Sequence, residues 1–226
     1  MPYYKVGEVD PKRSALIVVD MQNDFLLPDA PLEVEDGRAI IPRVKRAIDF
    51  CRERGIRVVY TVHVHRADGS DLGLFRHNSA IESGAALRDD APGAEVHRDI
   101  APKAGETVIK KHRYSGFYGT DLELVLRGAQ IDTVIIAGTT TENCCHATAR
   151  DAMFRDFKVV FLADATATFD YGDDGLGGLS SEQVHRASLI ILGQSTADVM
   201  SVDEFVARVQ RENNSGFDAG VDEDRR

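Results

Sequence analysis

The chain alternates short runs of β-branched residues with longer stretches in which apolar side chains recur every three to four positions. Strands are predicted at residues 15–19, 56–64, 107–110, 133–138, 158–162 and 197–200. Helices are predicted at residues 38–54, 120–127, 142–155, 180–192 and 202–211. This alternation is typical of βαβ units around a parallel sheet. We therefore predict an α/β fold, a three-layer αβα (Rossmann-like) arrangement with a six-stranded, mostly parallel sheet.

The chain contains no segment whose composition would separate two domains. Its 226 residues are 43% hydrophobic, which is enough apolar material for one complete core. We expect a single domain over residues 1–226, with its core at about residues 14–209. Residues 212–226 are polar and are expected to form a flexible tail.

The charge balance argues against some classes of partner. The chain has 27 Lys and Arg against 37 Asp and Glu, a net charge of −10. An acidic chain of this kind is not expected to bind nucleic acid or an anionic membrane. No apolar run is long enough to span a bilayer, and residues 1–13 lack the apolar segment of a secretory signal. Three cysteines are too few for a disulfide framework, so we expect a protein of the reducing cytoplasm. With nucleic acid and membranes disfavoured, the expected partner is a small-molecule substrate.

Chemically capable side chains follow three of the predicted strands. Asp20 follows the first strand and Lys111 the third, and Cys144 and Cys145 lie just after the fourth. Each has an ordinary structural explanation, as a turn residue, a solvated lysine or a small buried side chain. In open parallel sheets, however, ligands bind beyond the carboxyl ends of the strands. The coincidence at these ends favours one shared site.

These residue types suit the hydrolysis of an amide. A cysteine thiolate is a nucleophile, and a helix N-terminus and a nearby lysine are expected to lower the pKa of its thiol. An aspartate can accept the thiol proton and later give it to a leaving amine. The turn at residues 139–143 can direct backbone N–H groups at a developing oxyanion.

Three motifs identify a resemblance to the isochorismatase-like cysteine hydrolases. Residues 15–25 read ALIVVDMQNDF, residues 111–117 read KHRYSGF and residues 138–152 read GTTTENCCHATARDA. The resemblance covers about residues 14–209. It implies a catalytic triad of Asp20, Lys111 and Cys144, with Cys144 and not Cys145 as the nucleophile. It also implies a cis peptide at Thr139–Thr140 and an oxyanion hole made by the N–H groups of Thr140 and Cys144.

Parts of the sequence resemble particular subgroups of that family. Residues 65–75 are similar to a loop of N-carbamoylsarcosine amidases, and residues 111–123 also resemble ureidoacrylate amidohydrolases. We therefore predict cleavage of the C–N bond of a small ureido, carbamoyl or amide substrate, with release of ammonia through a thioester. The candidate substrate-binding residues are Gln22, Phe25, Tyr114 and Phe117. Three residues after the fifth strand could close the site: Thr166, Phe169 and Tyr171. If the substrate carries a carboxylate, it could be met by Arg66, Arg76 or Arg113.

The sequence leaves several functions open. Nicotinamidases carry a metal site after the second strand, but here His63 and His65 lack the accompanying carboxylate, so we predict no required metal and no cofactor. Three alternatives to the amidohydrolase remain: a nicotinamidase-like hydrolase, an isochorismatase-type hydrolase that cleaves a vinyl ether, and a non-catalytic binding module. A redox role for Cys144 and Cys145 is disfavoured because a helix opposes a disulfide between neighbours. The resemblance also implies a homo-oligomer, either a dimer or a tetramer.

Overall fold

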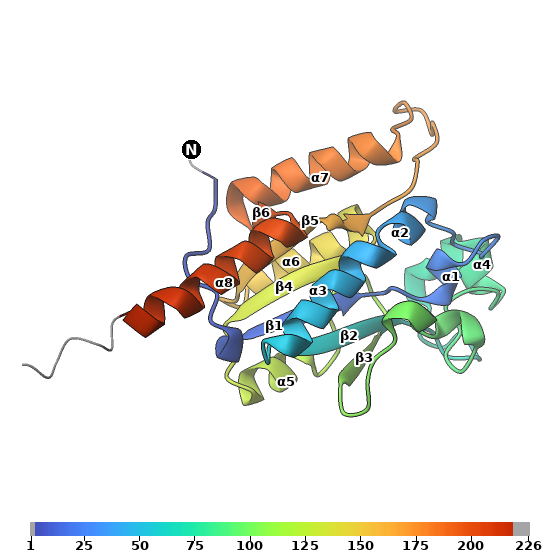
Figure 1. Cartoon of the computed structure of the whole chain (residues 1–226). Coiled ribbons are helices and arrows are strands. Elements are labelled where there is room, and N and C mark those ends of the chain that lie inside the picture. Colours follow the sequence, from blue (N-terminus) through green and yellow to red (C-terminus); the bar gives the residue numbers. More distant parts are fainter. Residues whose placement is uncertain (1–2, 219–226) are drawn as a thin grey trace, which may run out of the picture.

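Six parallel strands form one sheet in the order β3-β2-β1-β4-β5-β6 (Figure 1). The computed structural model describes residues 3–218, with side chains described as far as residue 211. Every pair of neighbouring strands is parallel, which confirms the predicted α/β fold with its sheet between helices. The strands are β1 (Ser14–Val19), β2 (Arg57–His63), β3 (Thr107–Lys111), β4 (Thr133–Thr139), β5 (Lys158–Ala167) and β6 (Asp198–Met200).

The helices vary widely in length. The longer ones are α2 (Glu35–Ala39), α3 (Ile41–Glu53), α5 (Leu122–Gly128), α6 (His146–Met153), α7 (Ser181–Ser195) and α8 (Val202–Asp218). Two single-turn helices are α1 (Asn23–Leu26) and α4 (Ser79–Glu82). Short 3-10 turns lie at Pro11–Arg13, Gly73–His77, Pro92–Ala94 and Arg98–Ile100, and a π-helical turn lies at Thr141–Cys145. None of the described helices is both long and apolar enough to cross a membrane.

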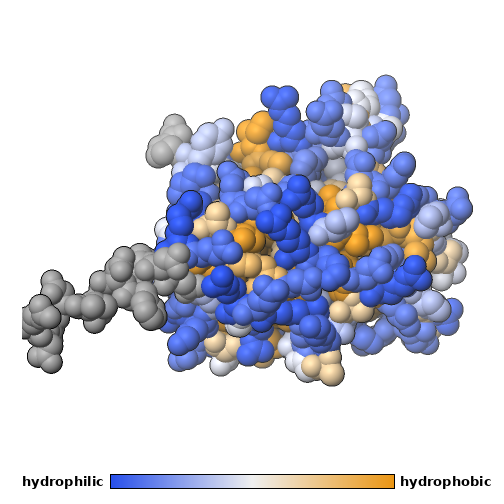
Figure 2. All heavy atoms as spheres, in the orientation of Figure 1, coloured by the Kyte–Doolittle hydropathy of each residue, from blue (hydrophilic) through white to orange (hydrophobic). Residues whose placement is uncertain are grey.

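Side chains of β1 alternate between two hydrophobic cores. Leu16 and Val18 pack in one core with residues of α3 and α8. Ala15, Ile17 and Val19 pack in the other core with residues of α5, α6 and α7. Because a strand directs successive side chains to opposite faces, a strand covered on both faces needs a continuous apolar run. Figure 1 shows α3 and α8 side by side over one face, and in Figure 2 their outer surface is mostly hydrophilic.

The structure corrects two helix boundaries. The helix expected at residues 38–54 is two helices, α2 and α3, with a proline in the first turn of α3, where no backbone N–H is needed. The helix expected from residue 120 begins at Leu122, with Asp121 as N-cap. The hydroxyl of Thr120 accepts from the N–H of Leu122 and donates to the carbonyl of Gly116. Helix α7 starts where it was expected: Ser180 is its N-cap, in a reciprocal pair of hydrogen bonds with Gln183.

The expected flexible tail is partly helical. Helix α8 continues to Asp218, beyond the predicted end at residue 211. The apolar pattern in the sequence stops earlier because only the first turns of α8 pack on the core. The helix can continue past them because its backbone hydrogen bonds, from residue i to residue i−4, do not require apolar side chains. The remainder of the predicted tail, residues 219–226, lies outside the described residues.

Candidate active site

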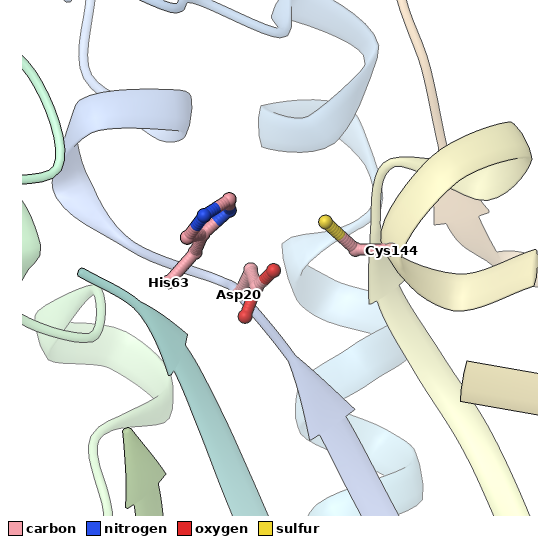
Figure 3. A group of neighbouring side chains, drawn as sticks. All are labelled: Asp20, His63 and Cys144. Atoms are coloured by element: carbon pink, nitrogen blue, oxygen red, sulfur yellow. The ribbon is translucent and has the colours of Figure 1, made fainter. Parts of the chain in front are cut away.

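The strand order brings the three predicted catalytic residues to one end of the sheet. Asp20 directly follows β1, Lys111 is the last residue of β3, and Cys144 lies in the π-helical turn after β4. All three are buried, with exposed fractions of 0%, 0% and 4% respectively. Figure 3 shows the side chains of Asp20 and Cys144 directed toward a common space, together with His63 from the end of β2.

Lys111 connects the other two members of this group. Its Nζ lies 2.6 Å from Oδ2 of Asp20 and donates to Sγ of Cys144 at 3.4 Å. A third bond, of 3.0 Å, goes to the carbonyl of Arg113. The hydroxyl of Thr61 donates to the other carboxylate oxygen of Asp20 at 2.7 Å. The carboxylate is therefore held on both oxygens, and its distance from the sulfur is at most 4.8 Å.

Burial sets the protonation of the nucleophile. Desolvation raises the pKa of the Cys144 thiol well above its usual value; Lys111 opposes this rise and the Asp20 carboxylate adds to it. The predicted net lowering of this pKa is therefore wrong, because removal of the thiolate from water outweighs the attraction of one ammonium. For Lys111, burial alone lowers the pKa, but the Asp20 carboxylate raises it above its usual value. The site thus holds a thiol and a lysine cation at rest.

The loop between β4 and the nucleophile has an unusual backbone. The Thr139–Thr140 peptide is cis, as the resemblance implied. Gly138 has a φ of +129°, and a Cβ there would lie 2.0 Å from the carbonyl oxygen of Val19, so only glycine fits. Thr140 and Cys144, the predicted oxyanion-hole residues, both border a cavity beside the nucleophile.

This cavity, of about 340 Å³, opens beside the sulfur of Cys144. Its lining comes from α1, α4 and the loops at the carboxyl ends of the strands: Phe25, Pro31, Leu32, Glu33, His63, Phe75, His77, Asn78, Ile81, Leu87, Tyr114, Thr140, Asn143, Cys144 and Phe169. Of the candidate substrate-binding residues, Phe25 and Tyr114 are in this lining. A volume of this size suits a small organic ligand.

Two further candidates lie outside the lining. The amide of Gln22 donates to the carbonyls of His63 and Ala94 and accepts from the N–H of His63, so it ties the end of β2 to a loop. The ring of Phe117 packs on Phe157 within the core, with ring centroids 5.8 Å apart. Both positions follow from hydrogen bonding and packing that the motif alone does not reveal.

The three candidate arginines also have other partners. Arg66 and Arg76 border a separate cavity, and Arg76 donates to the carbonyl of Gly69. Arg113 donates to the carbonyls of Asp71 and His112. None of the three is among the described residues that line the cavity beside Cys144, and a contact between one of them and a substrate carboxylate stays a prediction.

The sequence reasoning missed two parts of the site. Thr61 was not singled out, although the register pairs it with Val19, the residue before Asp20. A network at the cavity mouth was also missed: Oε1 of Glu142 accepts from Asn143 at 2.9 Å and from the hydroxyl of Tyr171 at 2.9 Å. The strand register could have revealed Thr61, whereas the network depends on how the loop after β5 folds back.

Among the described residues, two groups offer donors that could hold a metal ion. They are Asp20, His63 and Cys144, and His65, Asp71 and His112. An ion at the first group would compete with the ammonium of Lys111 for the same oxygen and sulfur. At the second group, Nδ1 of His112 lies 2.6 Å from the carbonyl of Val64, and Asp71 accepts from the N–H of Arg66. The absence of a required metal stays a prediction.

The model of the isochorismatase domain matches residues 14–204. The chain belongs to the isochorismatase family. A probable inactive nicotinamidase of Arabidopsis thaliana is 36% identical to this chain over 182 residues. The match covers 79% of this chain and 87% of that protein. An N-carbamoylsarcosine amidase of Arthrobacter sp. is 35% identical over 153 residues, 66% of this chain and 57% of that protein.

A solved structure supports the same assignment for this isochorismatase-family chain. The crystal structure of a cysteine hydrolase from Pseudomonas syringae pv. phaseolicola superposes with a TM-score of 0.89 at 35% identity. The match covers 93% of this chain and 98% of the other. The protein is therefore a member of the isochorismatase-like cysteine hydrolases.

Proposed function

We propose that this protein is a cysteine-dependent amidohydrolase that cleaves the C–N bond of a small ureido, carbamoyl or amide substrate and releases ammonia. The observation that carries the proposal is the position of Lys111, whose Nζ contacts both the Asp20 carboxylate and the Cys144 sulfur. An acid–base group, a fixed cation and a nucleophile thereby meet beside one cavity.

The reaction begins with a proton transfer within the buried group. Asp20 accepts the thiol proton of Cys144 as the sulfur attacks the substrate carbonyl carbon, and the N–H groups of Thr140 and Cys144 stabilise the oxyanion. Asp20 then gives this proton to the departing nitrogen, so that the C–N bond breaks, ammonia leaves and a thioester remains. Water, deprotonated by Asp20, adds to the thioester, and the C–S bond breaks to return the thiol and release the acid product.

Lys111 serves both halves of this reaction. Because the thiol is protonated at rest, the negative charge leaves Asp20 only as the substrate is attacked, and it passes through the sulfur to the carbonyl oxygen. The ammonium contacts both groups and stabilises either location of the charge. This arrangement favours an amidohydrolase over a vinyl-ether hydrolase, which needs no nucleophilic sulfur.

A panel of compounds tests the proposal. We expect ammonia release from at least one of N-carbamoylsarcosine, ureidoacrylate, biuret, nicotinamide and maleamate; nicotinamide is included because a relative is named for it. Cys144→Ala should lose this activity, and Cys145→Ala, the matched control at the neighbouring buried thiol, should retain it. Retained turnover in Cys144→Ala would refute the assignment. A homo-oligomeric state and a cytoplasmic location stay predictions.

A further inference from the structure

The cavity beside Cys144 is apolar away from the reacting sulfur. Its walls are mostly aromatic and aliphatic: Phe25, Pro31, Leu32, Phe75, Ile81, Leu87, Tyr114 and Phe169. The ring of Phe75 packs edge-on against His63 and against Tyr114, with centroids 5.1 Å apart in each case. Aromatic walls of this kind favour an apolar or aromatic ligand group over a charged one.

The charges around this cavity are unfavourable for an anion. Among the described residues, its lining includes no lysine or arginine but does include Glu33. Oε1 of Glu33 accepts from Arg38 at 2.6 Å, and this hydrogen bond lowers the pKa of Glu33, so the carboxylate stays ionised. Lys111, at the base, is occupied by Asp20 and Cys144. A carboxylate on the substrate would therefore face another carboxylate, already paired with Arg38, and would find no lysine or arginine in the described lining.

One of the two imidazoles in the lining, that of His63, adds no positive charge. Burial lowers the pKa of His63 well below its usual value, so this imidazole is neutral. Its Nε2 is buried and has no hydrogen-bond partner within the described part of the chain. The ring of His77 is exposed, and its Nδ1 lies 2.5 Å from the carbonyl of Leu74. The neutral His63 suits the polar amide or urea group of a substrate at the sulfur, whereas the apolar walls suit the remainder.

We propose that the substrate cleaved at Cys144 is a neutral amide or ureide whose other end is apolar and about the size of a phenyl ring. The inference rests on the proposed amidohydrolase function and narrows its substrate class. An apolar protein cavity of about 150 Å³ holds benzene. The observed cavity of about 340 Å³ therefore has room for a ring together with the amide group.

Matched pairs of substrates test this directly. 3-Phenylpropanamide and succinamate share a primary amide and differ in a phenyl ring or a carboxylate at the far end, and benzylurea and N-carbamoylglycine form the corresponding ureide pair. In ammonia-release assays we expect kcat/KM to favour the phenyl member by about 100-fold, because a carboxylate would lose its hydration without a partner. Equal or greater kcat/KM for the carboxylate member would overturn the inference.

A labelling experiment separates this inference from the proposed function. N-Benzyl-2-chloroacetamide and N-chloroacetylglycine alkylate thiols without any hydrolysis, and their rates are normalised to those with glutathione. We expect the benzyl reagent to modify Cys144 about 100-fold faster, as read from intact mass and absent in Cys144→Ala. If no compound releases ammonia but the benzyl reagent still labels Cys144 faster, the proposed amidohydrolase function is wrong and the inference of an apolar binding pocket is supported. Equal rates, or faster labelling by the glycine reagent, would refute the pocket assignment.

The charge of Glu33 provides a second test. Glu33→Gln removes the carboxylate from the lining and frees Arg38 beside it. The ratio of kcat/KM for succinamate to that for 3-phenylpropanamide should then rise about fivefold. Glu35→Gln, the matched control, removes an equal charge from an exposed position outside the lining and should leave the ratio unchanged. An equal ratio in Glu33→Gln and the parent would contradict the proposed role of charge.

Discussion

Nζ of Lys111 lies 2.6 Å from Oδ2 of Asp20, and both side chains are completely buried. Removing one partner of a buried ion pair leaves the other charge without water or a counter-ion, at a typical cost of about 3–5 kcal/mol. Replacement of both charges together avoids that cost. Stability and catalysis at this pair can therefore be separated by mutation.

We expect Asp20→Asn and Lys111→Met each to lower the free energy of unfolding by about 3 kcal/mol and to abolish turnover. The double variant should recover much of the lost stability and none of the activity, because the acid–base group is absent. Urea unfolding together with ammonia release measures both quantities. Activity in the double variant would show that the pair only supports the fold.

Thr61 is expected to position the catalytic carboxylate. Thr61→Val removes the hydroxyl that donates to Asp20 at 2.7 Å, and it should lower kcat about tenfold, corresponding to one hydrogen bond to a charged group. Thr61→Ser keeps the hydroxyl and should restore most of the rate. A valine variant with an unchanged kcat would exclude this role.

The buried imidazole of His63 predicts how stability depends on pH. Its pKa is well below the usual value in the folded protein, mainly because of burial and also because of the Lys111 charge. The unfolded chain takes up a proton below about pH 6.5 that the folded protein does not bind. The stabilisation is therefore present above that pH and is lost as the pH falls, by about 1.4 kcal/mol per pH unit.

Urea unfolding between pH 7.5 and 5 measures this slope. His63→Asn should lose less stability on acidification, because its unfolded chain takes up one proton fewer than that of the parent protein. Parallel slopes for the parent protein and His63→Asn would mean that His63 is protonated when folded.

Chelation tests the prediction that no metal is required. Dialysis against EDTA should leave ammonia release unchanged, because Lys111 already supplies the positive charge at the Asp20 and Cys144 groups. Elemental analysis of the purified protein accompanies the assay. One ion per chain, with activity lost on chelation and regained on its return, would contradict the prediction.

The sheet and the position of the triad could be predicted because their sequence signals are local. The run that forms β1 is apolar at every position after Ser14, as a strand covered on both faces requires, and Asp20 ends it. Cys144 follows β4 by a short turn, so topology alone brings it toward Asp20. Lys111 ends β3 and was found from its place in the same way, whereas the resemblance added its role in a triad and the cis peptide.

The cavity walls could not be predicted in this way. Residues 66–102 form only short helical turns and loops, and their position depends on contacts between distant segments. The carboxylate of Asp24, for example, accepts from the N–H of Leu87 at 2.6 Å, 63 residues away. The direction of the Cys144 pKa shift was also missed, because complete burial of the sulfur is a property of the folded chain alone.

The residues that would break the bond and the residues that would recognise the rest of the substrate occupy different parts of the chain. Asp20, Lys111 and Cys144 sit at the ends of strands or directly after them, fixed by the sheet. Most of the apolar wall comes from residues 25–33 and 75–87, which carry none of the triad. Substitutions in those two segments can therefore alter selectivity while reactivity stays intact, which makes them the natural route by which this scaffold could acquire new substrates.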